Sequence, residues 1–218
     1  MRIHLKLTSN TENVPFNYQG HLVQKFHEWV GENEIHDGLS LYSLSWLWGN
    51  VHKSKNSLNF REGATWLISA YDDALIRQVV NGIMGDGSVA FGMSVESISL
   101  QQTPDFSGKA AFRVASPVFI KRTVGEEQQY YYAKDDEANE LLTETLQHKL
   151  EKANLNPDVR VSFDDTYRKP AIKGMVYKGQ RMKGSICPVI VEGSAEAVAF
   201  AWNVGVGNGT GIGFGSLV

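Results

Sequence analysis

Histidine is the side chain in this sequence best suited to proton transfer, because its unperturbed pKa of about 6.5 leaves both forms populated at neutral pH. The chain has six histidines. His36 lies in a polar loop between a helical pattern and an apolar segment, and His27 lies at the edge of that helix's apolar stripe, one turn before Gly31. Both positions can serve acid–base chemistry. They also suit an idle surface histidine and a half-buried core histidine, respectively.

A second feature is that acidic and basic residues cluster in two separate segments of the chain. The whole chain carries a net charge of −3, from 21 Lys and Arg against 24 Asp and Glu, which is not typical of a nucleic-acid-binding protein. However, residues 126–158 hold nine acids against three bases, whereas residues 160–183 hold seven bases against two acids. The basic segment can present one positive face to a phosphate backbone. A solvated hairpin on an ordinary surface is the alternative.

The third feature is a glycine-rich tail, in which six glycines occupy alternate positions from Gly205 to Gly215. This spacing excludes the G-x-G-x-x-G dinucleotide fingerprint, and the chain has no G-K-[S/T] sequence of a P-loop. Glycine backbone can adopt positive φ and lets a ligand approach its N–H groups. A flexible C-terminus is the alternative, which apolar anchors such as Val206 and Phe214 oppose.

The elements that must position these residues follow from periodicity and capping. In the first half, apolar alternation predicts a strand at residues 3–7, and helical spacing predicts a helix over 18–31. Strands are predicted at 41–46, 64–70 and 94–100. Asp72 is expected to cap a second helix with its apolar face at Leu75, Ile76, Val79, Val80 and Ile83. The order β-α-β-β-α-β is that of a ferredoxin-like domain.

The second half repeats this order. Strands are predicted at 110–115, 159–163, 171–177, 181–191 and 214–218, with a strand segment at 130–132 and helices over 135–153 and 194–204. A hinge is expected near residues 102–108. We therefore predict an α+β protein of two tandem ferredoxin-like domains, residues 1–104 and 105–218.

Composition narrows the class further. The chain is 42% hydrophobic and 21% charged, as in globular proteins, and its longest apolar runs are far too short to span a bilayer. Residues 1–7 alternate apolar and basic side chains, unlike a signal peptide. The single cysteine, Cys187, is expected in the core. No Cys/His spacing suggests zinc. These features predict a cytoplasmic protein with no membrane partner, metal or cofactor.

The order and spacing of five segments resemble one known family. The chain is similar to the CRISPR-associated repeat-specific endoribonucleases of the Cas-six type, within the RAMP superfamily. The matching segments are residues 14–19 (VPFNYQ), 35–45 (IHDGLSLYSLS), 80–83 (VNGI), 115–118 (ASPV) and the glycine-rich tail 205–215. The resemblance covers nearly the whole chain and implies two ferredoxin-like domains.

The resemblance implies RNA cleavage without metal, in which a 2′-hydroxyl attacks the adjacent phosphate. It places the general acid–base residue at His36. At the position of His27 several family members have tyrosine, so this histidine is a departure, although a chemically competent one. Many members carry a lysine a few residues beyond the loop histidine, where this chain has Ser40. Another basic residue must then supply the missing cation, or the reaction is slower.

For RNA binding, the resemblance implies contacts from the second domain. The expected residues are Lys173, Lys178, Arg181 and Lys183 of the basic hairpin, with Gly209, Gly211 and Gly213 packed beside it. The partner is CRISPR repeat RNA or the guide RNA made from it, and further implied partners are a CRISPR effector complex and a second copy in a homodimer. Two alternatives stay open: a RAMP-type subunit that holds guide RNA without cutting it, and an idle domain with an unrelated partner.

Overall fold

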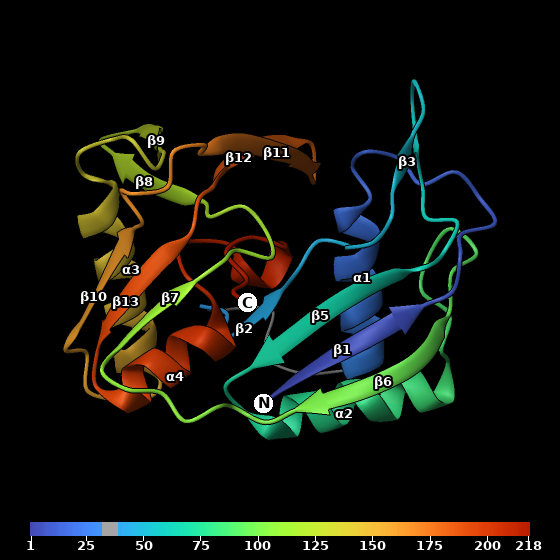
Figure 1. The fold of residues 1–218 in the computed structure, drawn as a ribbon, viewed down its shortest axis with the longest axis horizontal. Helices are drawn as coiled ribbons and strands as arrows, with labels where there is room; N and C mark the ends of the chain where they lie inside the picture. The colour runs from blue at the N-terminus through green and yellow to red at the C-terminus, as the bar shows by residue number, and fades with distance from the viewer. Residues whose placement is uncertain (32–38) are drawn as a thin grey trace.

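Two α/β units lie side by side in the computed structural model, which describes residues 1–31 and 39–218 (Figure 1). The first unit contains β1 (Arg2–Leu7), α1 (Gln19–Val30), β2 (Tyr42–Leu44), β5 (Ala64–Ala70), α2 (Asp73–Gly85) and β6 (Val95–Gln101). Among the described residues its strands pair antiparallel in the order β2-β5-β1-β6. This is the ferredoxin-like order, with α1 and α2 behind the sheet in Figure 1.

Local sequence signals explain why the elements of the first unit form where they do. Ile3, Leu5 and Leu7 alternate along β1 and are all buried. The Asp72 side chain accepts a hydrogen bond from the Ala74 N–H at 2.8 Å and so caps α2. These predictions from the sequence are confirmed. A small hairpin, β3 (His52–Lys53) with β4 (Leu58–Asn59), was not predicted, because two-residue strands show no alternation.

The second unit also follows the ferredoxin-like order. It contains β7 (Lys109–Phe112), β8 (Ile120–Val124), β9 (Glu127–Tyr131), α3 (Ala138–Lys152), β10 (Val159–Phe163), β11 (Ala171–Tyr177), β12 (Gln180–Ile186), β13 (Val189–Gly193), α4 (Ala195–Val204) and a 3₁₀ turn, η2 (Thr210–Ile212). Its sheet has the order β10-β13-β7. Beside β7, Arg113 and Val218 exchange two backbone hydrogen bonds of 3.0 and 2.9 Å, which puts the C-terminal residues in the fourth position.

Two predictions for this unit need correction. The single strand expected over 181–191 is wrong: the chain breaks at Cys187–Pro188 into β12 and β13. Proline lacks the N–H that a continuous ladder requires. β12 then pairs with β11 in a separate hairpin, and β13 enters the sheet. The last strand, expected over 214–218, is reduced to an isolated bridge between Val114 and Leu217.

Residues 102–108 connect β6 to β7 and so link the two sheets. The domain division at residues 104 and 105 stays a prediction. Each unit has its own cluster of buried apolar side chains, and Cys187 is buried in the second, as expected. None of the helices in residues 1–31 and 39–218 is long and apolar enough to cross a membrane.

Candidate functional site

His27 lies in the last turn of α1, half-buried, with its ring edge-on to that of Phe26 at a centroid distance of 5.3 Å. α1 ends at Gly31, whose φ of +75° is positive, as is common for the glycine that ends a helix. His36, the other predicted histidine, lies outside the described residues. The structure therefore describes the position of His27 and of the chain up to residue 31 and from residue 39, but not of His36.

The tip of the β11–β12 hairpin reaches from the second unit to α1 beside His27. A pocket of about 380 Å³ lies between them. It is lined by Gly20, Val23, Gln24, His27, Val176, Tyr177 and Lys178. The side-chain oxygen of Asn17 accepts a hydrogen bond from the Val176 N–H at 3.2 Å, which ties the hairpin to the residues before α1. Thus the predicted residues His27 and Lys178 line one pocket, although they come from different units.

Lys178 is held at this tip by a two-residue turn. Its φ is +46° and that of Gly179 is +77°, which is the pattern of a type I′ turn between antiparallel strands. The ammonium group lies 5.7 Å from the centre of the Tyr177 ring. This turn brings a cation into the pocket that contains His27.

Tyr42, which the sequence did not single out, stacks on Phe26 of α1 at a centroid distance of 4.9 Å. Burial raises the pKa of its hydroxyl, and a hydrogen bond with Ser40 opposes that shift. A Cβ added to Gly211 would lie 2.5 Å from Ser40 Oγ and 2.8 Å from Tyr42 Oη. Glycine is therefore required where the tail packs on these hydroxyl groups.

The glycine-rich tail is a packed loop. Gly209 and Gly213 have φ of +68° and +95° and flank η2, and the Trp46 indole donates a hydrogen bond of 2.8 Å to the Gly213 carbonyl. Gly211 and Gly213 are buried, whereas Gly209 is half-buried. The flexible alternative is therefore wrong. The RNA-binding role of these three glycines stays a prediction.

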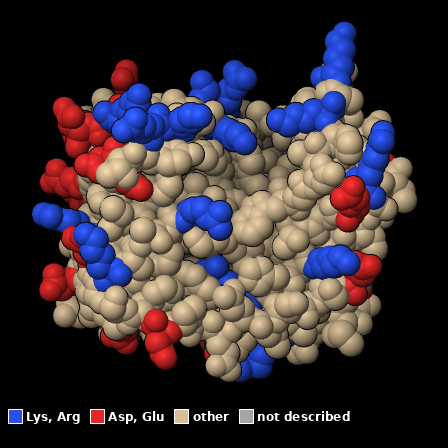
Figure 2. Space-filling model, in the orientation of Figure 1, with Lys and Arg blue, Asp and Glu red and all other residues tan. Residues whose placement is uncertain are grey.

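The predicted basic residues divide between the faces of the β11–β12 hairpin. Arg181 and Lys183 pair with Val176 and Gly174, so they share the outer face, and Lys173 shares the opposite face with the buried Met175. All three charged side chains are exposed. Figure 2 shows Lys and Arg along the edge of the molecule that carries the β8–β9 and β11–β12 hairpins, next to a hollow in the surface.

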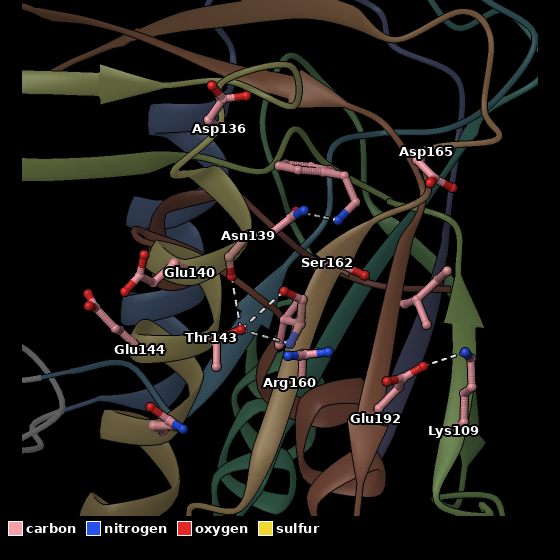
Figure 3. A pocket seen from close by; sticks show the side chains of 14 residues that line it. Lys109, Asp136, Asn139, Glu140, Thr143, Glu144, Arg160, Ser162, Asp165 and Glu192 are labelled. Atoms are coloured by element: carbon pink, nitrogen blue, oxygen red, sulfur yellow. Dashed lines mark hydrogen bonds and ion pairs between the residues drawn. The ribbon is translucent and has the colours of Figure 1, made fainter.

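A larger pocket, of about 940 Å³, lies elsewhere, between α3 and the sheet of the second unit (Figure 3). Asn139 and Thr143 of α3 bond to backbone groups of Phe163 and Val161 and so cover the free edge of β10. The charged residues that line this pocket are mostly acidic. Five are acids (Asp136, Glu140, Glu144, Asp165 and Glu192), and two are bases (Lys109 and Arg160). Such a lining disfavours phosphate, and no residue predicted as functional lies there.

Comparisons with known proteins identify the fold and the family. The chain superposes on a Cas6-related protein from Pyrococcus furiosus with a TM-score of 0.87 at 20% identity, covering 100% of this chain and 97% of that chain. A CRISPR-associated protein Cas6 matches with a TM-score of 0.84 at 20% identity, covering 100% and 98%. An RAMP protein that binds different RNA substrates matches with a TM-score of 0.85 at 18% identity, again covering 100% and 98%.

At these identities the superpositions establish the fold alone. A search among curated proteins gave no match. The model for the C-terminal part of CRISPR-associated protein Cas6 matches residues 101–218, which is more than half of the chain. The chain therefore belongs to the Cas6 family of CRISPR-associated proteins.

Proposed function

We propose that this protein is a metal-independent endoribonuclease that cleaves CRISPR repeat RNA. The 2′-hydroxyl attacks the adjacent phosphate, the bond to the 5′-oxygen breaks, and the products carry a 2′,3′-cyclic phosphate and a 5′-hydroxyl. Besides family membership, one observation carries this proposal: His27 of α1 and Lys178 of the basic hairpin line the same pocket. His36 follows His27 by nine positions in the sequence, and its role rests on the family resemblance.

In this reaction His27 and His36 form the acid–base pair. One accepts the proton of the 2′-hydroxyl, and the other donates a proton to the departing 5′-oxygen. Positioned acid–base groups of this kind typically contribute about 10² to 10⁴-fold in rate. The rate should follow a bell-shaped pH profile, because each histidine must be in a different protonation state. A flat profile between about pH 5 and 8 would exclude the two-histidine mechanism.

Lys178 provides the positive charge that a lysine supplies in many family members at the position of Ser40. The phosphate gains negative charge as the 2′-oxygen attacks, and a fixed ammonium group beside it stabilises that charge. Ser40 itself is hydrogen-bonded to Tyr42 and does not line this pocket. The exposed cations of the hairpin bind the RNA strand as it leaves this pocket.

The test is incubation of the purified protein with repeat RNA in EDTA, with end analysis of the products. His36→Ala and His27→Ala are each compared with wild type, and cleavage is expected to fall about 100-fold or more in each. His21→Ala is the matched control, because His21 is an exposed histidine on the same helix that lines a different pocket. It should cleave like wild type.

The outcomes separate the candidate functions. Cleavage to 5′-hydroxyl ends that depends on the histidines supports the proposal. Tight binding without cleavage would instead identify a subunit that holds guide RNA, the alternative that the departures from the family at His27 and Ser40 keep open. Cleavage that neither substitution affects would place the active site elsewhere in the molecule.

A further inference from the structure

The outer face of the β11–β12 hairpin contains a groove that the cleavage chemistry does not use. It has a volume of about 460 Å³, within the range of small-molecule sites. Asn17, Ile172, Gly174, Val176, Arg181 and Lys183 are among the residues that line it.

The strand register gives this groove its shape. Ile172, Gly174 and Val176 alternate along β11, so they lie on one face, with Gly174 between two β-branched side chains. The Lys183 stem packs over Gly174, with its Cγ 3.0 Å from where a Cβ would lie. Ile172 and Val176 are 56% and 39% exposed, so both present apolar surface to solvent. A flat, partly apolar ring can pack against such a surface.

The polar groups that line the groove suit a nucleotide. Arg181 and Lys183 stand on alternate residues of β12, about 7 Å apart, so they can bind successive phosphates of an extended strand. Asn17 binds a backbone N–H with its side-chain carbonyl, which fixes the orientation of the amide. The Asn17 NH₂ group can then donate a hydrogen bond to an acceptor atom on the edge of a base.

The groove adjoins the cleavage pocket. Val176 is among the residues that line both. Gly174 and Lys178 are four residues apart along an extended chain, which is about 13 Å. A strand whose phosphate lies beside Lys178 therefore passes the groove within a few nucleotides.

We propose that this groove is a subsite for one unstacked nucleobase, read by the amide of Asn17, and that it sets the sequence preference at one position near the cut. The proposal rests on the proposed function, because it takes the ligand to be the RNA strand that is cleaved. Unpaired bases are the parts of RNA that proteins read most specifically.

The experiment measures binding, so that it is independent of catalysis. Repeat RNAs carry a 2′-deoxynucleotide at the cleavage position, and each of the nearby bases is replaced in turn. Dissociation constants are obtained by fluorescence anisotropy for wild type, Asn17→Asp and Ile172→Ala. Asn17→Asp keeps the acceptor for the Val176 N–H and replaces the NH₂ donor with an acceptor. Asn156→Asp is the matched control, because Asn156 Oδ1 also accepts a backbone N–H, from Asp158 at 3.0 Å, away from the groove.

Wild type and Asn156→Asp should discriminate about tenfold between bases at one position. Asn17→Asp should lose this discrimination at that position and keep it at the others, and Ile172→Ala should weaken binding of the preferred base there. 2-Aminopurine at the same position should brighten on binding to wild type, as an unstacked base does.

Three results would overturn the subsite. The first is base discrimination that Asn17→Asp leaves unaltered. The second is a uniform loss of affinity in Asn17→Asp at every position, since it would reflect charge alone. The third is 2-aminopurine fluorescence that does not change at any position near the cut. Failure of wild type to bind repeat RNA would overturn the proposed function as well. If wild type cleaves unmodified repeat RNA and Asn17→Asp keeps the wild-type discrimination between bases, only the subsite is overturned.

Discussion

At the tip of the β11–β12 hairpin, Lys178 has a φ of +46°, a left-handed conformation that costs an L-residue about 1–2 kcal/mol. Asparagine or glycine is the usual residue at this place in a type I′ turn. Such a conformation is retained where the side chain has a task, and here the side chain enters the His27 pocket. Stability and function should therefore favour different residues at position 178.

Lys178→Asn tests this conflict. Asparagine tolerates the left-handed region, so the free energy of unfolding should stay unchanged or rise by up to about 1 kcal/mol. Cleavage should fall about 100-fold, because the cation beside the phosphate is lost. Urea unfolding and single-turnover cleavage measure the two effects, and Lys178→Arg should keep most of the activity. Full activity in Lys178→Asn would remove Lys178 from the chemistry.

Lys149 is a second residue with an unusual environment. Only 1% of it is exposed, and its ammonium group donates to the carbonyls of Val204 and Gly205 at 3.3 and 3.4 Å and to the Thr210 hydroxyl at 3.1 Å. It thereby joins the C-terminal end of α4 to η2 of the glycine-rich tail. Burial lowers the pKa of Lys149 from 10.5 to about 7.

This lowered pKa predicts a pH-dependent stability. Between about pH 7 and 10 the unfolded chain holds a proton at Lys149 that the folded chain has lost, so the free energy of unfolding should rise with pH in this window. Below about pH 7 both states are protonated and the contribution is constant. Urea unfolding of wild type and Lys149→Met at several pH values should show this slope in wild type only. Lys152→Met, an exposed lysine on the same helix, should keep the wild-type slope, and equal slopes in all three proteins would contradict the burial argument.

Among the elements, the β11–β12 hairpin carries most of the charge expected to meet RNA. Arg181 and Lys183 are exposed on its outer face, and each phosphate they neutralise releases counterions. Replacing both with alanine should weaken RNA binding and reduce the slope of log K against log salt by about 1.4. Titrations at four or more salt concentrations measure this slope.

The matched control removes two lysines from another exposed hairpin. Lys53 and Lys55 lie in and beside the β3–β4 hairpin, which projects from the first unit at the upper right of Figure 1. The double variant Lys53→Ala, Lys55→Ala changes the net charge by the same amount and should keep the wild-type slope. If both double variants reduce the slope equally, the effect comes from the total charge rather than from the hairpin.

Elements with local signals were predictable from the sequence. β10 and β11 have the expected bounds, and α4 begins after Ser194, whose hydroxyl accepts from the Ala197 N–H at 3.0 Å. The strand β8 was missed, because its residues Ile120–Val124 become exposed towards the end of the strand and show no sustained alternation. Local patterns predict elements that pack against a core, and exposed hairpins lack such a pattern.

The candidate site was predictable only in part. His27 and Lys178 each stood out in the sequence, but their meeting depends on the tie between Asn17 and Val176, which are 159 residues apart. No local pattern encodes a contact of that separation. Tyr42 gave no signal either, because an apolar strand explains it equally well.

The geometry of the candidate site depends on the contacts between the two units, because α1 belongs to the first unit and the β11–β12 hairpin to the second. Arg2 of β1 is 1% exposed and crosses to the second unit. Its guanidinium group donates to the carbonyls of Leu217 at 3.0 Å and Trp202 at 2.5 Å and lies 3.0 Å from the centre of the Trp202 ring. This side chain therefore bonds to both α4 and the C-terminal segment.

Arg2→Met removes the hydrogen bonds that Arg2 makes between the units and so tests what they contribute. Methionine fills much of the volume but leaves two buried carbonyls without their donor, at a cost of about 2–4 kcal/mol in the free energy of unfolding. Cleavage should fall with it even at temperatures where the variant stays folded, because a looser junction misplaces Lys178 relative to His27. Lys6→Met is the control: Lys6 is an exposed residue of the same strand, its ion pair with Glu96 is exposed, and the change should stay within about 0.5 kcal/mol. Urea midpoints and cleavage rates that are equal in the two variants would show that the units are held together elsewhere.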